Sequence, residues 1–459
     1  MDKWLTYSPV SGHGNTQITL SASTLTGLED RIATLIATGS QEGQTLSATT
    51  VITQKYATLT EIYFENLTWA TDIPYTGGTA DKNNCTYTIF AKYSDNSTKD
   101  ITNLANVTGS LFVPYSNEGE RRSAGTLTLT ATYEDKTCYG NVVAYQQAFD
   151  FSKKPLTFNI ISGGTIVWRI NSNIISKTIE YKLNNGEWIA TENAEVTVSA
   201  GDKIQFRGNN ATYGSENSIF KPFSNSTAVF AVEGNIMSLI NSTDFDSLTA
   251  LEGRFTFADF FRDCTGLTSA KNLVLPATTL GVFCYQDMFR NCTSLTTAPK
   301  ELPATTLTIG CYGGMFDGCT SLITVPELPA TTLIDGCYQG MFQGCTSLTT
   351  VPSNLLPATT FANSCYQSMF RGCTSLTTAP ELPATDLETR CYSHMFYNCT
   401  SLNYIKCLAI YISQPYCTDS WVYGVAPTGT FVQNPNLSVS DWPTGTSGVP
   451  KGWTVVNNS

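Results

Sequence analysis

Hydrophobic and polar positions recur along the C-terminal part of the chain with a period of 26 to 28 residues. A pattern of the form Cys-Tyr-x-x-Met-Phe-x-(Gly/Asn)-Cys-Thr-Ser-Leu occurs five times, with steps of 27, 26, 28 and 26 residues between copies. A degenerate sixth copy precedes them over residues 260–267. Self-similarity at this period is typical of a solenoid, because one unit buries its apolar face only when neighbouring units stack on it. The five copies begin at Cys284, Cys311, Cys337, Cys365 and Cys391.

The pattern inside one repeat predicts a helical turn, a short strand and a corner. Cys337 and Met341 are four residues apart and would share one face of a helical turn. Gly344 would end this turn, because in the five copies its slot holds Gly or Asn, which accept the left-handed backbone of a helix stop. Apolar and polar positions alternate over residues 348–352 up to a proline, which predicts a short strand. Residues 356–360 predict the turn into the next repeat.

The repeats resemble a known family. Their Phe-x-x-Cys-x-x-Leu-x-x-(Val/Ala)-Pro-x-Leu-Pro pattern, over about residues 250–405, resembles the BspA-type leucine-rich repeats of surface proteins from Bacteroides and its relatives. In that family the repeats are adhesive or architectural, and none is a catalytic centre. The resemblance implies a leucine-rich-repeat solenoid over residues 236–459, with a cap over residues 236–258 and a Trp-containing cap after residue 405.

Residues 1–57 contain four short runs of β pattern, which predict a small antiparallel β unit. The Trp-Leu-x-x-x-Pro-x-Ser-Gly-x-Gly-Asn opening and the Val-Ile-Thr-Gln close resemble the BACON domain. That family has an immunoglobulin-like β-sandwich fold, occurs in Bacteroides proteins and their phages, and is thought to bind carbohydrate or mucin. Trp4 would be either a core residue, which we favour, or a platform for a sugar ring. His13 lies in a glycine-rich turn, where we expect it to be solvated.

Two further β modules are expected before the repeats. Residues 58–150 alternate apolar and polar positions, and residues 93–102 resemble the Tyr-x-Asp-Gly-(Ser/Thr)-x-Asp-Ile-Thr signature of bacterial Ig-like domains, with Asn for the usual Gly. Cys85 and Cys138 could pair across this module. Residues 151–235 contain hairpin signals and predict a β-rich spacer domain. The expected fold class is therefore multidomain and mainly β, with tandem immunoglobulin-like β-sandwiches followed by a leucine-rich-repeat solenoid.

The charge balance narrows the range of partners. The chain carries a net charge of −11 with a pI near 4.8, and only 14% of its residues are charged. Nucleic acid and anionic membranes are not expected as partners, because no basic patch is available to neutralise phosphates. Membrane insertion is not expected either, because the sequence lacks a run of 18 apolar residues.

Fifteen cysteines raise the question of metal or disulfide chemistry, and eleven of them occupy the two fixed slots of the repeat. Their Cys-x7-Cys spacing does not match the close pairs of a zinc site, and His13 and His394 are the chain's two histidines. No metal and no other cofactor is expected. A disulfide ladder is one alternative, since equivalent residues of stacked coils would lie about 4.8 Å apart. We favour reduced core thiols, because the count is odd and the slots suit a small apolar residue.

The sequence favours a non-enzymatic protein. It contains no Gly-rich phosphate loop, no His-Glu metal motif and no nucleophile elbow. A pair of glycosidase carboxylates leaves no local signature, so a sugar-degrading fibre is the enzymatic alternative.

The combination of modules resembles surface proteins of Bacteroides and virion proteins of crAss-like gut phages. It implies a fibre, or a capsid or tail decoration, on the virion surface that displays the solenoid for adhesion to a host-surface glycan or protein. The N-terminal modules would contact other virion proteins, and a homo-oligomer is a further expectation. An exported adhesin on the bacterial surface is the alternative. The opening Met1-Asp2-Lys3 has no apolar leader after it, which favours the virion. A purely structural decoration of the virion, which binds no receptor, is a further alternative.

The candidate ligand-binding residues follow the first cysteine of each repeat. A glycan site needs flat aromatic faces beside polar groups, and this slot would present a tyrosine stripe next to a variable pair such as Ser393-His394. We favour the alternative that these tyrosine rings pack between coils, with their hydroxyls hydrogen-bonded. The candidates are Tyr285, Tyr312, Tyr338, Tyr366, Tyr392 and His394.

Overall fold

The chain divides into two compact units, residues 1–149 and residues 150–459. In the described part of the chain the fold is mainly β, as expected, and its helices are four short 3-10 turns. None of these described helices is long and apolar enough to cross a membrane. The computed structural model describes residues 5–8, 19–22, 31–41, 44–54, 57–74, 77–113, 122–147, 150–169, 177–214, 220–437 and 442–458.

The first unit begins with two antiparallel hairpins. β1 (Leu5–Ser8) pairs with β2 (Thr19–Ala22), and β3 (Arg31–Gln41) pairs with β4 (Gln44–Gln54) from Arg31 opposite Gln54 to Gln41 opposite Gln44. These strands overlap the four runs of β pattern that the sequence predicts, and β3 and β4 are longer than predicted. Trp4 and His13 lie outside the described residues.

The rest of the first unit consists of short antiparallel sheets around one small core. The alternation of β11 makes this core: Leu127, Leu129 and Ala131 are fully buried, whereas Thr128 between them is exposed. Asn96, at the Gly position of the Ig-like signature, has a φ of 65°, a conformation that Asn accepts more readily than most residues. The strands are β5 (Leu59–Trp69), β7 (Cys85–Tyr93) and β8 (Thr98–Asp100) in one sheet, β9 (Asn106–Thr108), β11 (Arg122–Tyr133) and β12 (Lys136–Gln146) in a second, and β6 (Gly78–Asp81) and β10 (Ser110–Val113) in a third.

The second unit opens with a sheet that continues into the repeats. Its strand order is β16-β15-β18-β13-β19-β21, and the final pair, β19 with β21, is parallel. β19 belongs to the predicted spacer and β21 to the predicted solenoid, and both contribute to one continuous apolar core from Leu156 to Trp453. The predicted boundary at 235/236 therefore falls inside this core, and the described residues between 151 and 235 form the N-terminal end of the stack. The strands are β13 (Leu156–Ser162), β15 (Ile179–Leu183), β16 (Ile189–Thr191), β18 (Lys203–Gly208), β19 (Val229–Asn235) and β21 (Leu267–Val274), and β14 (Gly164–Trp168) pairs with β17 (Ala194–Val198) beside them.

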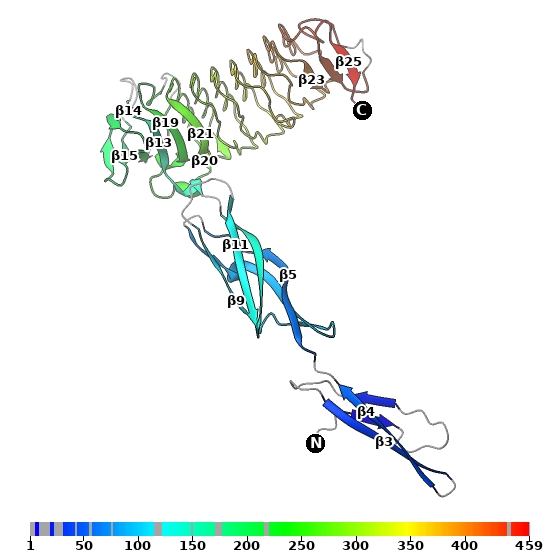
Figure 1. Ribbon diagram of the computed structural model, residues 1–459. Helices are drawn as coiled ribbons and strands as arrows, with labels where there is room; N and C mark the ends of the chain where they lie inside the picture. Colours follow the sequence, from blue (N-terminus) through cyan, green and yellow to red (C-terminus); the bar gives the residue numbers. More distant parts are fainter. Residues whose placement is uncertain are drawn as a thin grey trace. The chain divides into compact units, whose positions relative to one another are not determined.

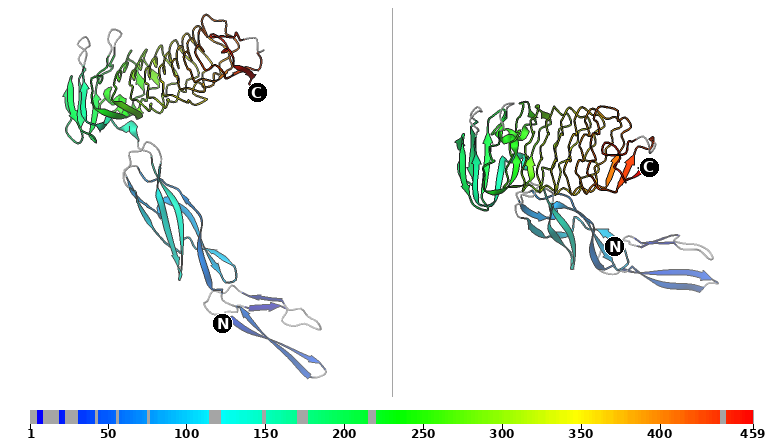
Figure 2. Two further views of the ribbon diagram at one scale, coloured as in Figure 1. Left: turned by 45° about the horizontal axis from the view of Figure 1, so that its top comes forward. Right: turned by 90° about the horizontal axis from the view of Figure 1, so that it is seen from above.

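From about residue 255 the chain forms a stack of coils that ends in a three-stranded parallel sheet, as Figures 1 and 2 show within this unit. That sheet contains β23 (Tyr404–Cys407), β24 (Thr430–Gln433) and β25 (Thr454–Asn457). Residues 348–352, predicted as a strand, contain no strand, and neighbouring coils are joined there by single bridges such as Thr378 to Tyr404.

The predicted helical turn is wrong: each coil instead contains a segment of successive tight turns. In this segment, backbone N–H groups alternate between two kinds of partner. The Met288 N–H donates to the Tyr285 carbonyl at 3.3 Å, whereas the Phe289 N–H donates to the Met315 carbonyl of the next coil at 2.8 Å. A left-handed residue at every fourth position prevents continuous helical bonding, so alternate N–H groups bond along the stack.

Among the described residues, seven coils share this turn segment, one more than the sequence predicts, because residues 416–424 repeat it beyond the predicted boundary at residue 405. The Gly or Asn predicted as a left-handed stop is confirmed in all five copies, and two further left-handed positions precede it in each coil. Their φ angles lie between 50° and 75°. The left-handed residues at these positions are Phe255, Asp259 and Asp263 in coil 1, Phe283, Asp287 and Asn291 in coil 2, Gly310, Gly314 and Gly318 in coil 3, Gly336, Gly340 and Gly344 in coil 4, Ser364, Ser368 and Gly372 in coil 5, Arg390, His394 and Asn398 in coil 6, and Tyr416, Ser420 and Gly424 in coil 7. Coil 1 has one more left-handed residue, Phe257, with a φ of 62°.

The apolar slots of the repeat are buried in columns, as predicted. Cys284, Met288, Phe289 and Leu295 are fully buried, and so are their equivalents in the other four copies. The phenylalanine rings of coils 2 to 6 stack with centroids 5.3 to 5.8 Å apart. All fifteen cysteines are free thiols, including half-buried Cys85 and Cys138. The thiol of the second cysteine donates to a phenylalanine carbonyl of the preceding coil, for example from Cys319 to Phe289 at 3.0 Å.

Candidate functional site

The five candidate tyrosines lie inside the stack, so they do not form the surface stripe that the sequence suggested. Each ring is at most 1% exposed, and successive rings stack with centroids 5.7 to 6.3 Å apart. The rings thus pack between coils, but the hydroxyls of Tyr285, Tyr312, Tyr338 and Tyr392 have no hydrogen-bond partner among the described residues. This placement withdraws Tyr285, Tyr312, Tyr338, Tyr366 and Tyr392 as ligand-binding residues.

The reason for this placement is a four-residue period in the turn segment. In coil 2, Cys284 and Tyr285 point inward and the next two residues point outward, after which Met288 and Phe289 again point inward. The pattern of two inward and two outward residues follows from the left-handed residue at every fourth position. The outward residues of successive coils form one surface, which we call the turn face.

His394 is the one predicted site residue on this surface. It is half-buried, its Nδ1 lies 2.8 Å from the Ser393 hydroxyl, and its ring centroid is 5.5 Å from that of Tyr397. His394 is therefore held by its neighbours, beyond the end of the groove described next.

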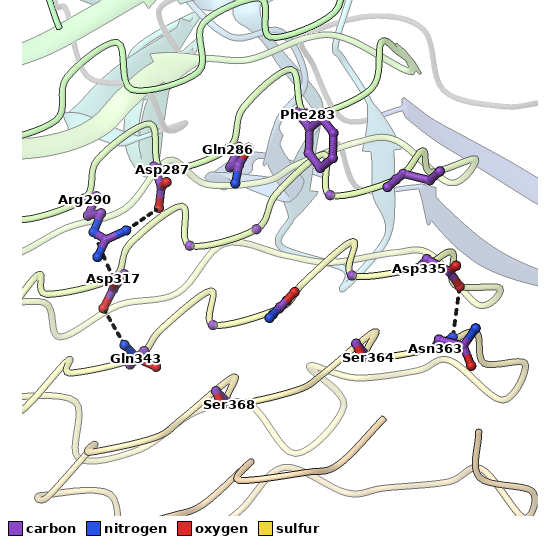
Figure 3. A pocket seen from close by; sticks show the side chains of 17 residues that line it. Phe283, Gln286, Asp287, Arg290, Asp317, Asp335, Gln343, Asn363, Ser364 and Ser368 are labelled. Carbon is purple, nitrogen blue, oxygen red and sulfur yellow. Dashed lines mark hydrogen bonds and ion pairs between the residues drawn. The ribbon is translucent and has the colours of Figure 1, made fainter. Parts of the chain in front are cut away.

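The turn face of coils 2 to 5 contains a groove of about 580 Å³ (Figure 3). It is hollow because coils 3 and 4 carry glycine where coil 2 carries Phe283 and Asp287 and coil 5 carries two serines. The lining residues are Phe283, Gln286, Asp287, Arg290, Ile309, Gly310, Gly313, Gly314, Asp317, Asp335, Gly336, Gln339, Gly340, Gln343, Asn363, Ser364 and Ser368.

One end of the groove presents an aromatic ring. Phe283 is half-buried, and its ring stacks on that of Phe255 with centroids 5.0 Å apart and planes 24° apart. The ring occupies the space that a side chain at Gly310 would fill. Ile309, beside it, is 46% exposed. An apolar surface therefore borders an otherwise polar hollow.

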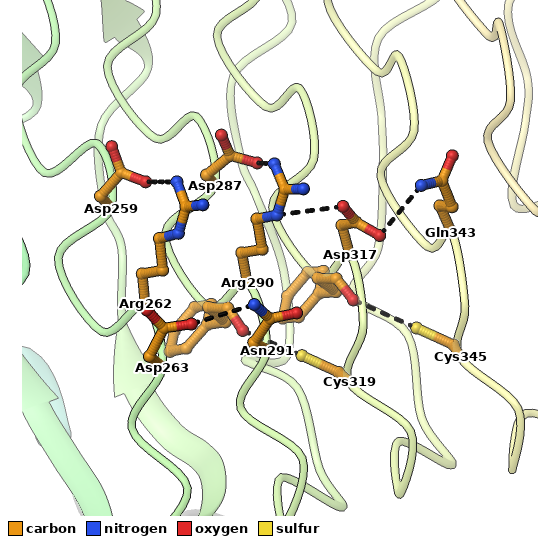
Figure 4. Close-up of polar contacts among 12 residues, drawn as sticks. Asp259, Arg262, Asp263, Asp287, Arg290, Asn291, Asp317, Cys319, Gln343 and Cys345 are labelled. Atoms are coloured by element: carbon orange, nitrogen blue, oxygen red, sulfur yellow. Dashed lines mark hydrogen bonds and ion pairs between the residues drawn. The ribbon is translucent and has the colours of Figure 1, made fainter. Parts of the chain in front are cut away.

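A row of alternating charges lines one wall of the groove (Figure 4). Arg290 lies 3.4 Å from the Asp287 carboxylate and 3.2 Å from the Asp317 carboxylate, which in turn accepts a hydrogen bond from Gln343 at 3.2 Å. Burial raises the pKa of Asp287 to about 6, with the guanidinium of Arg290 opposing the rise. Burial also raises the pKa of Asp317. These carboxyls are thus partly withdrawn from water although they border an open groove.

The rest of the groove lining is polar and largely uncharged. Gln339 is exposed, and Ser364 and Ser368 are half-buried. The backbone N–H of Asn363 donates to the Asp335 carboxylate at 3.0 Å, which fixes that carboxylate at the rim. Amides, hydroxyls and carboxylates thus face the same hollow and offer both donors and acceptors.

The groove was not predicted from the sequence, although a signal was present. The slots of Gly310, Gly314, Gly336 and Gly340 hold Phe, Asp, Ser, Arg or His in the neighbouring repeats. Four missing side chains in two adjacent repeats imply a local hollow, but only once the four-residue period is known.

No group of His, Cys, Asp or Glu side chains suited to a metal ion occurs among the described residues. No protein-family model matches the chain, and neither a curated protein nor a solved structure matches it. The functional conclusion therefore depends on the chemistry of the groove itself.

Proposed function

We propose that this chain is a non-enzymatic binding protein whose coil stack holds a glycan in the turn-face groove. The observation that carries the proposal is the lining of the groove, where amide, hydroxyl and carboxylate groups surround a hollow bordered by the Phe283 ring. Polar groups of this kind exchange hydrogen bonds with sugar hydroxyls, and an aromatic ring packs against the apolar C–H face of a sugar. A volume of about 580 Å³ lies in the range of small-molecule sites.

The geometry of the groove favours an extended ligand. Its lining residues come from four successive coils, so the hollow runs along the stack. Neighbouring coils linked as in a parallel sheet are about 4.8 Å apart, which gives a length of about 14 Å between the first and fourth coil. Such a length exceeds that of a single sugar ring, so an oligosaccharide segment is the proposed ligand.

We further propose that the chain is a leucine-rich-repeat solenoid carried on BACON-like and bacterial Ig-like sandwiches at the surface of a phage virion. The resemblance of these modules to virion proteins of crAss-like phages supports the proposal. The groove would then bind a host-surface or mucosal glycan, while the N-terminal modules contact other virion proteins. An exported Bacteroides adhesin would use the same groove in the same way.

The direct experiment is to apply the chain of 459 residues to an array that carries mucin O-glycans and Bacteroides capsular oligosaccharides. We expect binding that the free oligosaccharide competes away. If no glycan binds at any tested concentration, the proposed function is wrong and a purely structural decoration becomes the better account.

Sugar cleavage is the second candidate, and the raised pKa of Asp287 is the observation that favours it, because a general acid needs such a pKa. Against it, Arg290 contacts both Asp287 and Asp317, so both carboxyls already have a cationic partner. Incubating the chain with an oligosaccharide that it binds, and measuring new reducing ends, separates the two. Binding without release of reducing ends supports the non-enzymatic function.

A further inference from the structure

The turn face changes its chemistry between the two ends of the stack. In coils 1 to 3, its acidic residues are paired with cations, as Asp259 is with Arg262 at 2.7 Å and Asp263 is with Lys221 at 2.7 Å. In coils 5 to 7, the outward pairs instead carry two arginines and three tyrosines, and Asp419 is the one carboxylate among them. We call the five residues the Arg/Tyr patch. They are Arg371, Arg390, Tyr397, Tyr416 and Tyr423.

The Arg/Tyr patch is ordered by contacts between its cations and its rings. The Arg371 guanidinium carbon lies 5.0 Å from the Tyr397 ring centroid, and the Tyr397 ring stacks on Tyr423 at 4.8 Å with planes 17° apart. In the same way, the Arg390 guanidinium carbon lies 5.4 Å from the Tyr416 ring centroid. Each guanidinium is therefore held against a ring.

The two arginines remain exposed and uncompensated by charge. Neither Arg371 nor Arg390 forms an ion pair with any carboxylate in the described ranges, and both are exposed. Tyr416 and Tyr423 are 63% and 48% exposed. Two free guanidinium forks beside accessible rings are unusual on a chain with a net charge of −11.

The backbone adds a second indication. Arg390 and Tyr416 have φ angles of 58° and 57°, in slots where coils 3 and 4 carry Gly310 and Gly336. A large side chain is disfavoured in this left-handed conformation relative to glycine. The fold therefore does not require these two side chains, and their presence points to a role at the surface.

The patch is continuous with the groove. Ser368, which lines the groove, donates its backbone N–H to the Ser393 carbonyl of coil 6 at 2.9 Å. Gly372, next to Arg371, donates to the Tyr397 carbonyl at 2.8 Å, and Asn398 donates to the Tyr423 carbonyl at 2.7 Å. A chain lying in the groove and continuing along the stack would therefore reach the patch.

We propose that the Arg/Tyr patch is a second subsite that binds the anionic group of an acidic sugar, either a carboxylate or a sulfate ester. This inference rests on the proposed glycan-binding function and names the ligand class. A guanidinium presents a planar fork of donors that matches a carboxylate or a sulfate, and the exposed tyrosine rings offer a face for the sugar ring. The ligand would place neutral units in the groove and the acidic unit over coils 5 to 7.

The test uses the chain of 459 residues and an array of neutral, carboxylated and sulfated oligosaccharides that share the same core. We expect the acidic glycans to bind at least about tenfold more tightly than their neutral counterparts, and this preference to weaken between low and high sodium chloride. The double variant Arg371→Gln/Arg390→Gln should lose the preference and keep the neutral binding. The carboxylated and sulfated arms distinguish the two sources of negative charge.

The matched control is Lys300→Gln/Lys451→Gln, which removes two exposed positive charges outside the turn segments. It should keep the preference for acidic glycans. Equal binding of acidic and neutral glycans, or a preference that survives in the arginine variant, would overturn this inference while leaving the groove intact. The absence of binding to every glycan would instead reject the proposed function and this inference together.

Discussion

The ring of Phe283 occupies the space over Gly310, where a Cβ atom would lie 2.3 Å from the ring carbons. This contact joins the aromatic end of the groove to its floor, because the ring keeps its position only while residue 310 has no side chain. It also makes the two residues a test of how tightly the turn face is packed.

Replacing Gly310 with alanine should lower the free energy of unfolding of the second unit by about 2–4 kcal/mol. The loss has two causes, because alanine is strained in the left-handed conformation and its Cβ atom displaces the Phe283 ring. Gly340→Ala is the control, since its φ of +64° is similar but nothing lies within 4 Å of the added Cβ. It should cost about 1–2 kcal/mol. Urea denaturation measures both, and equal losses would show that the Phe283 ring moves away freely.

Removing a hydroxyl from the tyrosine column should not weaken the fold. The Tyr338 hydroxyl is buried without a hydrogen-bond partner among the described residues, so Tyr338→Phe should change the free energy of unfolding by less than about 0.5 kcal/mol or stabilise by up to about 1 kcal/mol. The control is Tyr213→Phe, whose hydroxyl donates to the Leu239 carbonyl at 2.8 Å and should cost about 1–2 kcal/mol. A loss at residue 338 as large as at residue 213 would show that its hydroxyl is hydrogen-bonded.

Stability should depend on pH through Asp287. Burial raises the pKa of this carboxyl from 3.8 to about 6, so between these pH values the folded chain binds more protons at this site than the unfolded chain. Its contribution to stability is therefore fully present below about pH 4 and is lost as the pH rises through about 6. Relative to the wild type, Asp287→Asn should gain about 1–3 kcal/mol between pH 4 and pH 7, since the other carboxyls cancel in the comparison. A difference in unfolding free energy that stays constant with pH would contradict this.

The cysteine columns should behave as unreactive core thiols. Burial raises the pKa of Cys311 to about 11 and that of Cys337 to about 12, so little thiolate exists at neutral pH. A thiol reagent should label the folded chain at Cys85 and Cys138 at most, which are half-buried, and label all fifteen cysteines after unfolding. Reductant should leave the melting temperature unchanged, because no disulfide worth about 2–5 kcal/mol is lost. A large drop in melting temperature on reduction would show that bridges form and would favour an exported adhesin.

The buried columns could be predicted from the sequence, but the surface of the stack could not. Cys337, Met341 and Phe342 recur in every copy, and residues that recur with the period of the stack pack against one another. The helical interpretation failed because Cys337 and Met341, four residues apart, fit both a helix and a chain of tight turns. Of these two structures, only the chain of tight turns places Tyr338 inward. It depends on left-handed residues at positions such as Gly336 and Gly340, and the copies fill these positions with different residue types.

The groove was hidden for the same reason. Asp287 and Asp317 are not equivalent positions in their repeats, so no alignment of the copies brings them together. The stack does so through Arg290, which reaches both carboxylates from one side of the groove. Likewise, the contact of Arg371 with Tyr397 joins two repeats and appears only once the coils are stacked.

The central claim is tested most directly by filling the floor of the groove with a side chain and measuring the affinity for the glycan. Gly340→Asn adds a side chain with no atom in its way, in a slot where Asp287, Ser368 and His394 already adopt φ angles of 55° to 58°. The variant should keep its fold and lose less stability than Gly340→Ala, because Asn accepts this conformation more readily. Its affinity for the array-selected oligosaccharide, measured by calorimetry, should fall at least about tenfold, a loss of about 1.4 kcal/mol.

The matched control is Gly372→Asn, which makes the same change at a left-handed position of the turn face outside the groove lining. It should bind the oligosaccharide like the wild type. If Gly340→Asn and Gly372→Asn both bind as tightly as the wild type, the turn-face groove is not the glycan site.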